Sequence, residues 1–267
     1  ASVGTTGGAV SALNTNLLKN SDFFTPAFPA EYGNTTSGVF DIGFRNGNSK
    51  KRETTIQLGV ITGLEATTEG PINKDKGSSY LVGYRYGLAG VAKLVGVDIG
   101  TTATPSYQDL SFKLNSGTSK LGKFSMFGIL ASSTINIEGG NSNSLYGNGN
   151  QVDFASKIGI GGLNHFKQIN TKSFISSTIG LNYSKTDQTS YDFDRVANTS
   201  FTKEVSNVAK TGYNFSSTYN LKVSPKFFIK AGIQDELMGL DLFYKTKQKV
   251  VVLQWPLSSC LVRAADS

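Results

Sequence analysis

From Lys51 onward, apolar and polar residues alternate along most of the chain. A period of two is the pattern of β-strands, because successive side chains of a strand point to opposite faces of the sheet. Residues 200–223 show it most clearly, since Tyr213, Phe215 and Tyr219 alternate there with asparagine, serine and threonine. The alternation predicts about nine strands, over residues 51–60, 63–71, 78–86, 107–115, 122–132, 152–162, 172–184, 200–223 and 227–244.

The connections between these strands are predicted to be short and long in turn. Short polar turns are expected near residues 73–77, 116–120, 164–170 and 224–226, and long connections near residues 87–105, 133–150 and 185–199. Such an asymmetry is typical of outer-membrane β-barrels, in which a lipid-facing apolar band and a polar lumen explain the alternation. We therefore expect an all-β fold, an antiparallel transmembrane β-barrel portion. Because single-chain bacterial barrels have an even number of strands, a count of about nine indicates an incomplete barrel.

The two ends of the chain do not follow this alternation. Residues 1–48 are mixed in composition, are interrupted by glycine and proline, and are too few to bury a self-sufficient core. Residues 248–267 lose the period of two and carry the only tryptophan and the only cysteine. We expect three parts: a small globular piece over residues 1–48, the barrel portion over residues 49–247, and an irregular tail over residues 248–267, which a change of reading frame would explain.

Composition supports long strands with one polar face. Hydrophobic residues make up 38% of the chain and charged residues 17%, and glycine contributes 30 residues. The aromatic content is too high for a disordered chain. The net charge of +7 is modest, and the lysines and arginines are scattered rather than clustered, which argues against nucleic-acid binding. No run of about 18 apolar residues predicts a membrane helix.

The sequence shows no constellation of residues that indicates catalysis, a metal or a cofactor. The single cysteine, Cys260, and the single histidine, His165, are too few for a tetrahedral metal site. The glycines of residues 159–162 lack both the helix pattern and the lysine of a phosphate-binding loop. The aspartates of residues 187–194 lack the spacing of a calcium-binding loop. We therefore expect no enzyme activity and no cofactor.

An ordered series of short motifs lies between residues 14 and 86. It reads NTNLLKNSDFF, then FPAEYGNTTSGVFDIGFRNGN, then TTIQLG, EGPI and SYLVGYRY. The series resembles the TonB-dependent receptors of the outer membrane of Gram-negative bacteria, in which a plug domain ends with a YG…GGV segment before the barrel begins. The matching positions are Tyr32, Gly33, Gly38 and Val39, and Ser37 stands where the family often has the first of two glycines.

The resemblance implies a function for each part of the chain. Residues 1–48 would be the C-terminal part of a plug domain, and residues 49–247 the N-terminal part of the barrel. The protein would lie in the outer membrane of a Gram-negative bacterium, in contact with its lipid, and would take part in the energised uptake of a scarce solute. An inner-membrane complex would supply the energy through an N-terminal region that this sequence lacks. The sequence does not specify the solute, and a chain with an unclosed barrel is not expected to transport alone.

Five polar residues fall on the strand faces that are predicted to line the lumen: Arg85, Lys113, Asp153, Lys157 and Lys230. Side chains at such positions would contact either a solute or the plug. The resemblance favours the plug as their partner.

Two other functions fit the same pattern. A complete small outer-membrane barrel, acting as a passive pore or an adhesin-like binding protein, would pair its first strand with its last. A soluble secreted β-sandwich that binds glycans would need protein on both faces of its strands. The polar second faces of residues 107–115 and 213–223 argue against the sandwich.

Overall fold

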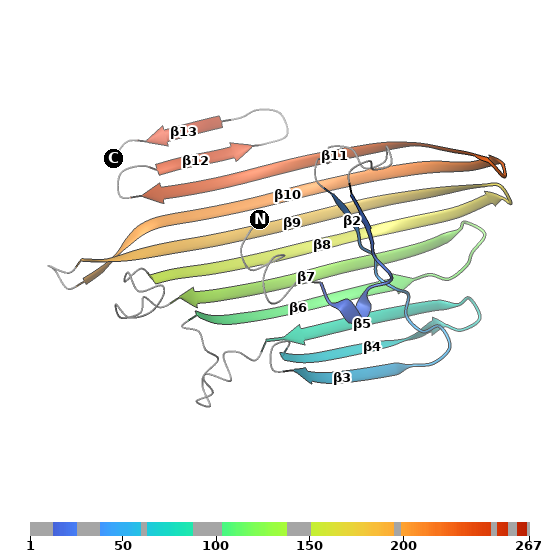
Figure 1. Cartoon of the computed structure of the whole chain (residues 1–267), viewed down its shortest axis with the longest axis horizontal. Coiled ribbons are helices and arrows are strands. Elements are labelled where there is room, and N and C mark those ends of the chain that lie inside the picture. The colour runs from blue at the N-terminus through green and yellow to red at the C-terminus, as the bar shows by residue number, and fades with distance from the viewer. Residues whose placement is uncertain are drawn as a thin grey trace.

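Each strand of the main sheet pairs antiparallel with the next strand along the chain (Figure 1). The computed structural model describes residues 13–25, 38–59, 63–87, 103–137, 151–194, 199–246, 250–255 and 261–265. Within this part of the chain the fold is all-β, as predicted, apart from the single turn of 3-10 helix η1 (Thr15–Leu17). No helix among these residues is long and apolar enough to cross a membrane.

The sheet is built on a meander of nine strands, β3 to β11, which correspond to the nine predicted strands. Strands β3–β7 have 7 to 15 residues, whereas β8–β11 have 20 to 26. Their bounds are β3 (Glu53–Gly59), β4 (Gly63–Asn73), β5 (Ser78–Tyr86), β6 (Ala103–Asn115), β7 (Lys123–Ile137), β8 (Gln151–Asn170), β9 (Ser173–Asp194), β10 (Thr199–Ser224) and β11 (Phe227–Thr246). Two short strands, β12 (Val250–Trp255) and β13 (Leu261–Ala265), extend the sheet to eleven strands.

The strands reach further than the alternation predicted. Residues 164–170, expected to form a turn, belong to β8, and the turn follows at Thr171 and Lys172. Residues 185–194, expected to form a loop, belong to β9 and pair with β10. Both predictions were wrong because the ladder consists of backbone hydrogen bonds, which polar side chains do not prevent. Residues 248–267 were predicted to be irregular but contain β12 and β13, since an apolar run without alternation also pairs.

The short turns expected near residues 73–77 and 224–226 are confirmed, at residues 74–77 and 225–226. The turn expected at residues 116–120 lies between β6 and β7, where Ser119 and Gly122 form an isolated bridge. Most of the two long connections expected near residues 87–105 and 133–150 lies outside the described residues, although residues 103–105 and 133–137 belong to strands.

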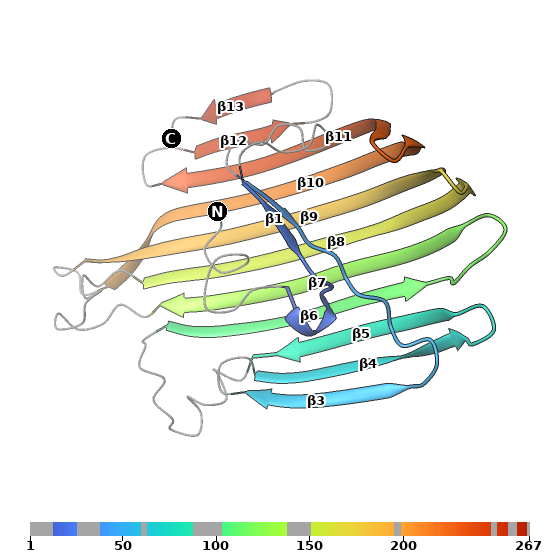
Figure 2. The same ribbon diagram turned by 45° about the vertical axis from the view of Figure 1, so that its right-hand side comes forward.

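The sheet is open and does not close into a barrel. Strand β3 lies at one edge and β13 at the other, and no described residue of β3 pairs with β13. Figures 1 and 2 show one layer of strands side by side. Of the predicted barrel portion, the structure therefore shows the antiparallel sheet and not the closure.

The N-terminal segment, which we define as residues 13–25 and 38–48, crosses one face of this sheet (Figure 2). It contains η1 and a ribbon of two antiparallel strands, β1 (Asp22–Phe24) and β2 (Val39–Asp41). We term the sheet face beneath the segment the covered face and the opposite one the open face. The buried apolar core of the described residues lies between the segment and the covered face and consists of Leu17, Phe44, Leu81 and Ile129.

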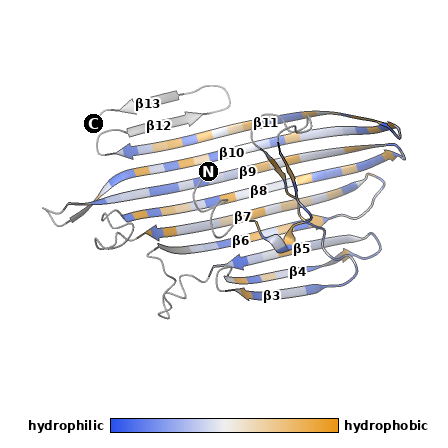
Figure 3. Cartoon of the chain, in the orientation of Figure 1, coloured by the Kyte–Doolittle hydropathy of each residue, from blue (hydrophilic) through white to orange (hydrophobic). Residues whose placement is uncertain are grey.

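The register assigns every strand residue to one of the two faces. Arg85 pairs with Asp109, Asp109 with Ala131, and Ala131 with Ile158, so these side chains share the covered face. The residues between them in sequence point to the open face. Figure 3 shows hydrophobic and hydrophilic residues following one another along the long strands, as this alternation requires.

The open face carries large apolar side chains that no described residue covers. Leu58 is 75% exposed, Ile233 is 70% exposed and Ile179 is 59% exposed, on strands at both edges and in the middle of the meander. Monomeric soluble proteins rarely expose apolar patches that run over so many strands.

A substitution at Gly47 tests whether the N-terminal segment packs on β5. A Cβ atom at this position would overlap the backbone carbonyl oxygen of Tyr80 in β5, so we expect Gly47→Ala to weaken the docking of the segment by roughly 1–3 kcal/mol. Hydrogen exchange at the Arg45 amide, which donates to the Leu17 carbonyl over 2.9 Å, should become roughly fivefold faster or more.

The matched control is Gly159→Ala. The nearest atom to a Cβ there is Leu130 Cδ2 at 3.6 Å, an ordinary van der Waals contact, so exchange at the Arg45 amide should not change. Equal exchange rates in the two variants would show that the segment does not rest on β5.

Candidate functional site: a polar seam under the N-terminal segment

Strand β4 turns two carboxylates toward the N-terminal segment. Glu65 and Glu69 are four residues apart, so both point to the same face of the strand. Together with Asn14, Asn16 and Arg45 of the segment they form what we term the polar seam. Each of the two carboxylates accepts hydrogen bonds from the segment.

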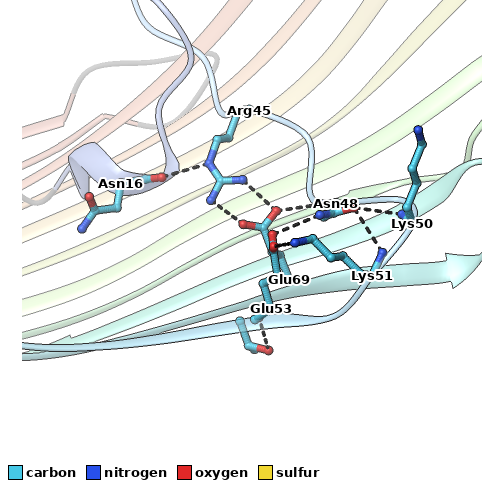
Figure 4. A network of polar contacts seen from close by, with 8 residues as sticks. Asn16, Arg45, Asn48, Lys50, Lys51, Glu53 and Glu69 are labelled. Atoms are coloured by element: carbon cyan, nitrogen blue, oxygen red, sulfur yellow. Dashed lines mark hydrogen bonds and ion pairs between the residues drawn. The ribbon is translucent and has the colours of Figure 1, made fainter.

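Arg45 and Glu69 form the strongest contact of the polar seam (Figure 4). Nη1 and Nη2 of Arg45 each donate to one carboxylate oxygen of Glu69, both over 2.8 Å. The backbone amide of Asn48 donates to Glu69 Oε2 over 2.7 Å, and Arg45 Nε donates to the carbonyl of Asn16 over 3.0 Å. This two-pronged geometry matches the planar guanidinium to the carboxylate, and the hydrogen bond from Glu69 raises the pKa of Arg45.

Asn48 sets the direction in which the segment enters β3. Its side-chain oxygen accepts from the amides of Lys50 and Lys51, over 2.9 and 3.2 Å, as asparagine does in tight turns. Its amide group donates to Glu53 over 3.0 Å. Lys51 Nζ lies 2.6 Å from Glu53, but both side chains are exposed, so this ion pair contributes little stability.

Asn14 and Asn16 hold the second carboxylate. Asn14 is the N-cap of η1, and its side-chain oxygen accepts from the amide of Asn16 over 2.9 Å. The amide nitrogens of Asn14 and Asn16 both donate to Glu65 Oε1, over 2.9 and 2.7 Å. Glu65 is buried, so these donors replace the water that a buried carboxylate loses.

Leu17 follows these asparagines and anchors the segment by packing. It is fully buried, and it lies where a side chain on Gly83 would be, since a Cβ there would stand 2.7 Å from Leu17 Cδ1. The glycine therefore creates the depression in β5 that receives the leucine. Ser111, the register partner of Gly83 in β6, is also small and fully buried.

An ion pair lies on the covered face beside the polar seam. Arg85 Nε is 2.9 Å from Asp109 Oδ2 and 3.2 Å from Oδ1, and both side chains are buried. Glu65 is the register partner of Arg85 on the other side. Because a buried ion pair costs desolvation and is directional, it fixes the arrangement of its neighbours more than it adds stability.

The polar seam is suited to holding the segment on the sheet. Its carboxylates are occupied by hydrogen bonds from Asn14, Asn16, Arg45 and Asn48. Among the described residues no group of three or more histidine, cysteine, aspartate or glutamate side chains is placed to hold a metal ion. His165, expected in a turn, lies in β8, where its ring stacks on Phe124 and Nε2 is 2.8 Å from the Leu121 carbonyl.

The four residues of the plug-end motif are only partly described. Tyr32 and Gly33 lie outside the described residues. Val39 begins β2 and pairs with Phe24, and Gly38 precedes it, with the ring of Phe23 only 3.2 Å from the place of a Cβ. The role of these residues as the end of a plug stays a prediction.

The five polar residues predicted to share one face do not all share it. Arg85 and Lys113 lie on the covered face, and Lys113 Nζ donates to the carbonyl of Phe44 over 2.7 Å, so Lys113 contacts the N-terminal segment. Lys230 lies on the same face of β11, where it is exposed.

Asp153 and Lys157 lie on the open face instead, because their neighbours Ile158 and Ile160 pair with Ala131 and Ile129 on the covered face. The prediction for these two residues was wrong for a physical reason. The apolar side of β8 was assigned to lipid, whereas it turns toward the N-terminal segment.

Sequence reasoning did not single out the residues of the polar seam. A signal for Glu65 and Glu69 exists, since Thr67 between them completes a polar face on the strand of residues 63–71. Asn14 and Asn16 stand in a similar i, i+2 relation. No pattern in the sequence shows that these groups, which come from two distant stretches of chain, form hydrogen bonds with each other.

The chain was also compared with known proteins. It matches no protein-family model and no curated protein.

Removing the Arg45 side-chain charge tests the polar seam. Arg45→Met keeps an unbranched apolar stem but leaves the Glu69 carboxylate without its two-pronged partner, which should weaken docking of the segment by about 1–3 kcal/mol. Exchange at the Lys19 amide, which donates to the Gly43 carbonyl over 2.8 Å, should become about tenfold faster.

The matched control for this change is Arg52→Met, which removes the same charge from an exposed side chain nearby. The control should leave the Lys19 amide unaffected. If Arg45→Met and Arg52→Met behave alike, the contact with Glu69 does not hold the segment.

Proposed function

We propose that this chain forms the end of the plug domain and the first barrel strands of a TonB-dependent outer-membrane receptor. The observation that carries the proposal is the contrast between the two faces of the sheet. Most large side chains of the open face are apolar and without cover among the described residues, although Asp153 and Lys157 also lie on it, while the covered face holds an inner segment through polar contacts. A barrel in lipid with a plug inside requires this arrangement.

The apolar side chains of the open face form a band of suitable height. On β9 the open-face residues Ile175, Ile179, Leu181 and Tyr183, with Ser177 among them, are followed by Lys185. From Ile175 to Tyr183 the strand rises about 26 Å, at roughly 3.3 Å per residue. The apolar band of outer-membrane barrels is about 25 Å tall and their strands are tilted by about 35–45°, so this length of β9 spans roughly 20 Å, most of that height.

The long strands provide more length than a bilayer requires. A membrane-spanning strand needs about 9–11 residues, and β8–β11 have 20 to 26. The surplus on β9 and β10, residues 185–194 and 199–210, is rich in threonine, serine, aspartate and lysine. Under the proposal this part of the sheet rises above the membrane into water.

The proposed receptor would take up a scarce solute with energy from an inner-membrane complex, and residues 1–48 would be the end of its plug. The polar seam would fasten that end to the barrel wall at β4, and Leu17 would anchor it on β5. The sheet edges at β3 and β13 leave backbone groups without a partner strand. We therefore infer that transport needs further strands that close the barrel. The proposal includes no enzyme activity, cofactor or nucleic-acid partner.

The two alternative functions find less support. A complete small barrel requires the first and last strands of the sheet to pair, and in the described part of the chain β3 and β13 lie at opposite edges. A glycan-binding sandwich requires a second layer over the open face, and the described residues supply none.

Tryptophan quenching by brominated lipids tests which face meets lipid. Phe215 is on the open face and the adjacent Ser216 is on the covered face at the same depth. With Trp255 replaced by Phe and the chain reconstituted in vesicles of brominated phospholipid, Phe215→Trp should be quenched several-fold more than Ser216→Trp. Equal quenching, or no association with vesicles, would contradict the proposal.

Two further measurements separate the alternatives. In a Gram-negative bacterium that makes the protein, fractionation should place it in the outer membrane, whereas recovery in the soluble secreted fraction would favour the sandwich. Liposomes that carry the isolated chain should not swell in sugar solutions. Swelling would favour the passive pore.

A further inference from the structure

A cavity of about 440 Å³ lies between the N-terminal segment and the sheet, on the side away from the polar seam. It falls in the range of roughly 300–1,000 Å³ that is usual for small-molecule sites. Strands β6, β7 and β8 supply one wall and the segment supplies the other. Most of its lining is apolar and consists of Leu13, Ile42, Phe44, Phe127, Ile129 and Ile160.

The polar groups that line this cavity are hydrogen-bond donors. Lys113 uses one of its three ammonium hydrogens for the carbonyl of Phe44, over 2.7 Å. The Lys19 side chain lies along Gly43, with Nζ 3.1 Å from the place of a Cβ. Asn164 accepts from Thr178 Oγ1 through its side-chain oxygen, over 2.9 Å, which leaves its amide nitrogen as the group for the cavity.

The nearby acceptors are already used. The Gly43 carbonyl accepts from the Lys19 amide over 2.8 Å, and the Phe44 carbonyl accepts from Lys113. Among the described residues, neither lysine has a carboxylate within ion-pair distance. Lys113 is partly buried and Lys19 is exposed. The described residues thus place two ammonium groups beside a largely apolar space with no carboxylate to balance them, although a partly buried charge such as that of Lys113 is normally paired.

We propose that this cavity binds an organic carboxylate with a compact apolar body. The carboxylate accepts from Lys113, Lys19 and Asn164, and the apolar body packs against the aliphatic and aromatic lining. A phosphate dianion fits less well, because it has no apolar part and costs more to remove from water than these few donors offset. The site requires the N-terminal segment to be docked on the sheet. It does not require the protein to lie in a membrane.

Fluorine NMR gives a direct test with the chain in nonionic detergent and a protein-free micelle blank. The probe is 4-fluorophenylacetate, and the matched neutral probe is 4-fluorophenylacetamide, which has the same body without the charge. We expect the carboxylate to bind at least tenfold more tightly than the amide, and inorganic phosphate at the same concentration not to displace it. No binding of the carboxylate, or equal binding of the amide, would overturn the proposal.

Three variants locate the binding site. Lys113→Met should weaken binding of 4-fluorophenylacetate at least tenfold, whereas Lys157→Met removes the same charge from the open face and should have no effect. Because Lys113→Met also removes the bond to Phe44, a second variant keeps both lysines. Ile160→Trp fills the cavity from β8 and should abolish binding. Unchanged binding in Lys113→Met or Ile160→Trp, or an equal loss in Lys157→Met, would overturn the proposal.

Discussion

Every strand of this sheet presents alternate side chains to opposite faces, and the described residues cover only one of these faces. The described part of the chain supplies no second sheet or helix for the other side of this single layer, so the chemistry of the two faces differs. Ile56, Leu58 and Ile233 remain exposed on one side, while Glu65, Arg85 and Asp109 are buried on the other. The small core, the polar seam and the cavity all lie on the covered face because the N-terminal segment crosses it there.

The polar seam and the cavity differ in whether their polar groups have hydrogen-bond partners. In the seam, the carboxylates of Glu65 and Glu69 meet donors from Asn14, Asn16, Arg45 and the Asn48 amide. In the cavity, Lys113 donates one hydrogen to the Phe44 carbonyl, and the remaining lysine and asparagine donors have no acceptor among the described residues. A satisfied network holds a segment in one position, whereas an unsatisfied set of donors in an apolar space recognises an anion. The two regions lie under the same segment, so its docking creates both.

The alternation predicts much of the sheet and little of the site. It indicates which residues of one strand share a face. Arg85, for example, falls on the polar face of β5 and Lys113 on the polar face of β6. It does not indicate which face of the next strand continues that surface, because this depends on the register and on what covers the sheet. Ile158 and Ile160 look like lipid-facing residues, yet they lie on the covered face, and Lys157 is consequently on the other side. The polar seam was beyond prediction for the same reason, since Asn14 and Glu65 are separated by 51 residues.

The sequence by itself determined the class of fold, the number of strands in the meander, and several of its turns. These properties depend on local side-chain periodicity and on glycine and proline punctuation, which a single stretch of chain contains. Only the tertiary structure decided the lengths of the long strands, the open edges, the docking of the N-terminal segment and the contents of each face. These features depend on backbone pairing between strands and on contacts between distant stretches, and neither leaves a periodic trace in the sequence.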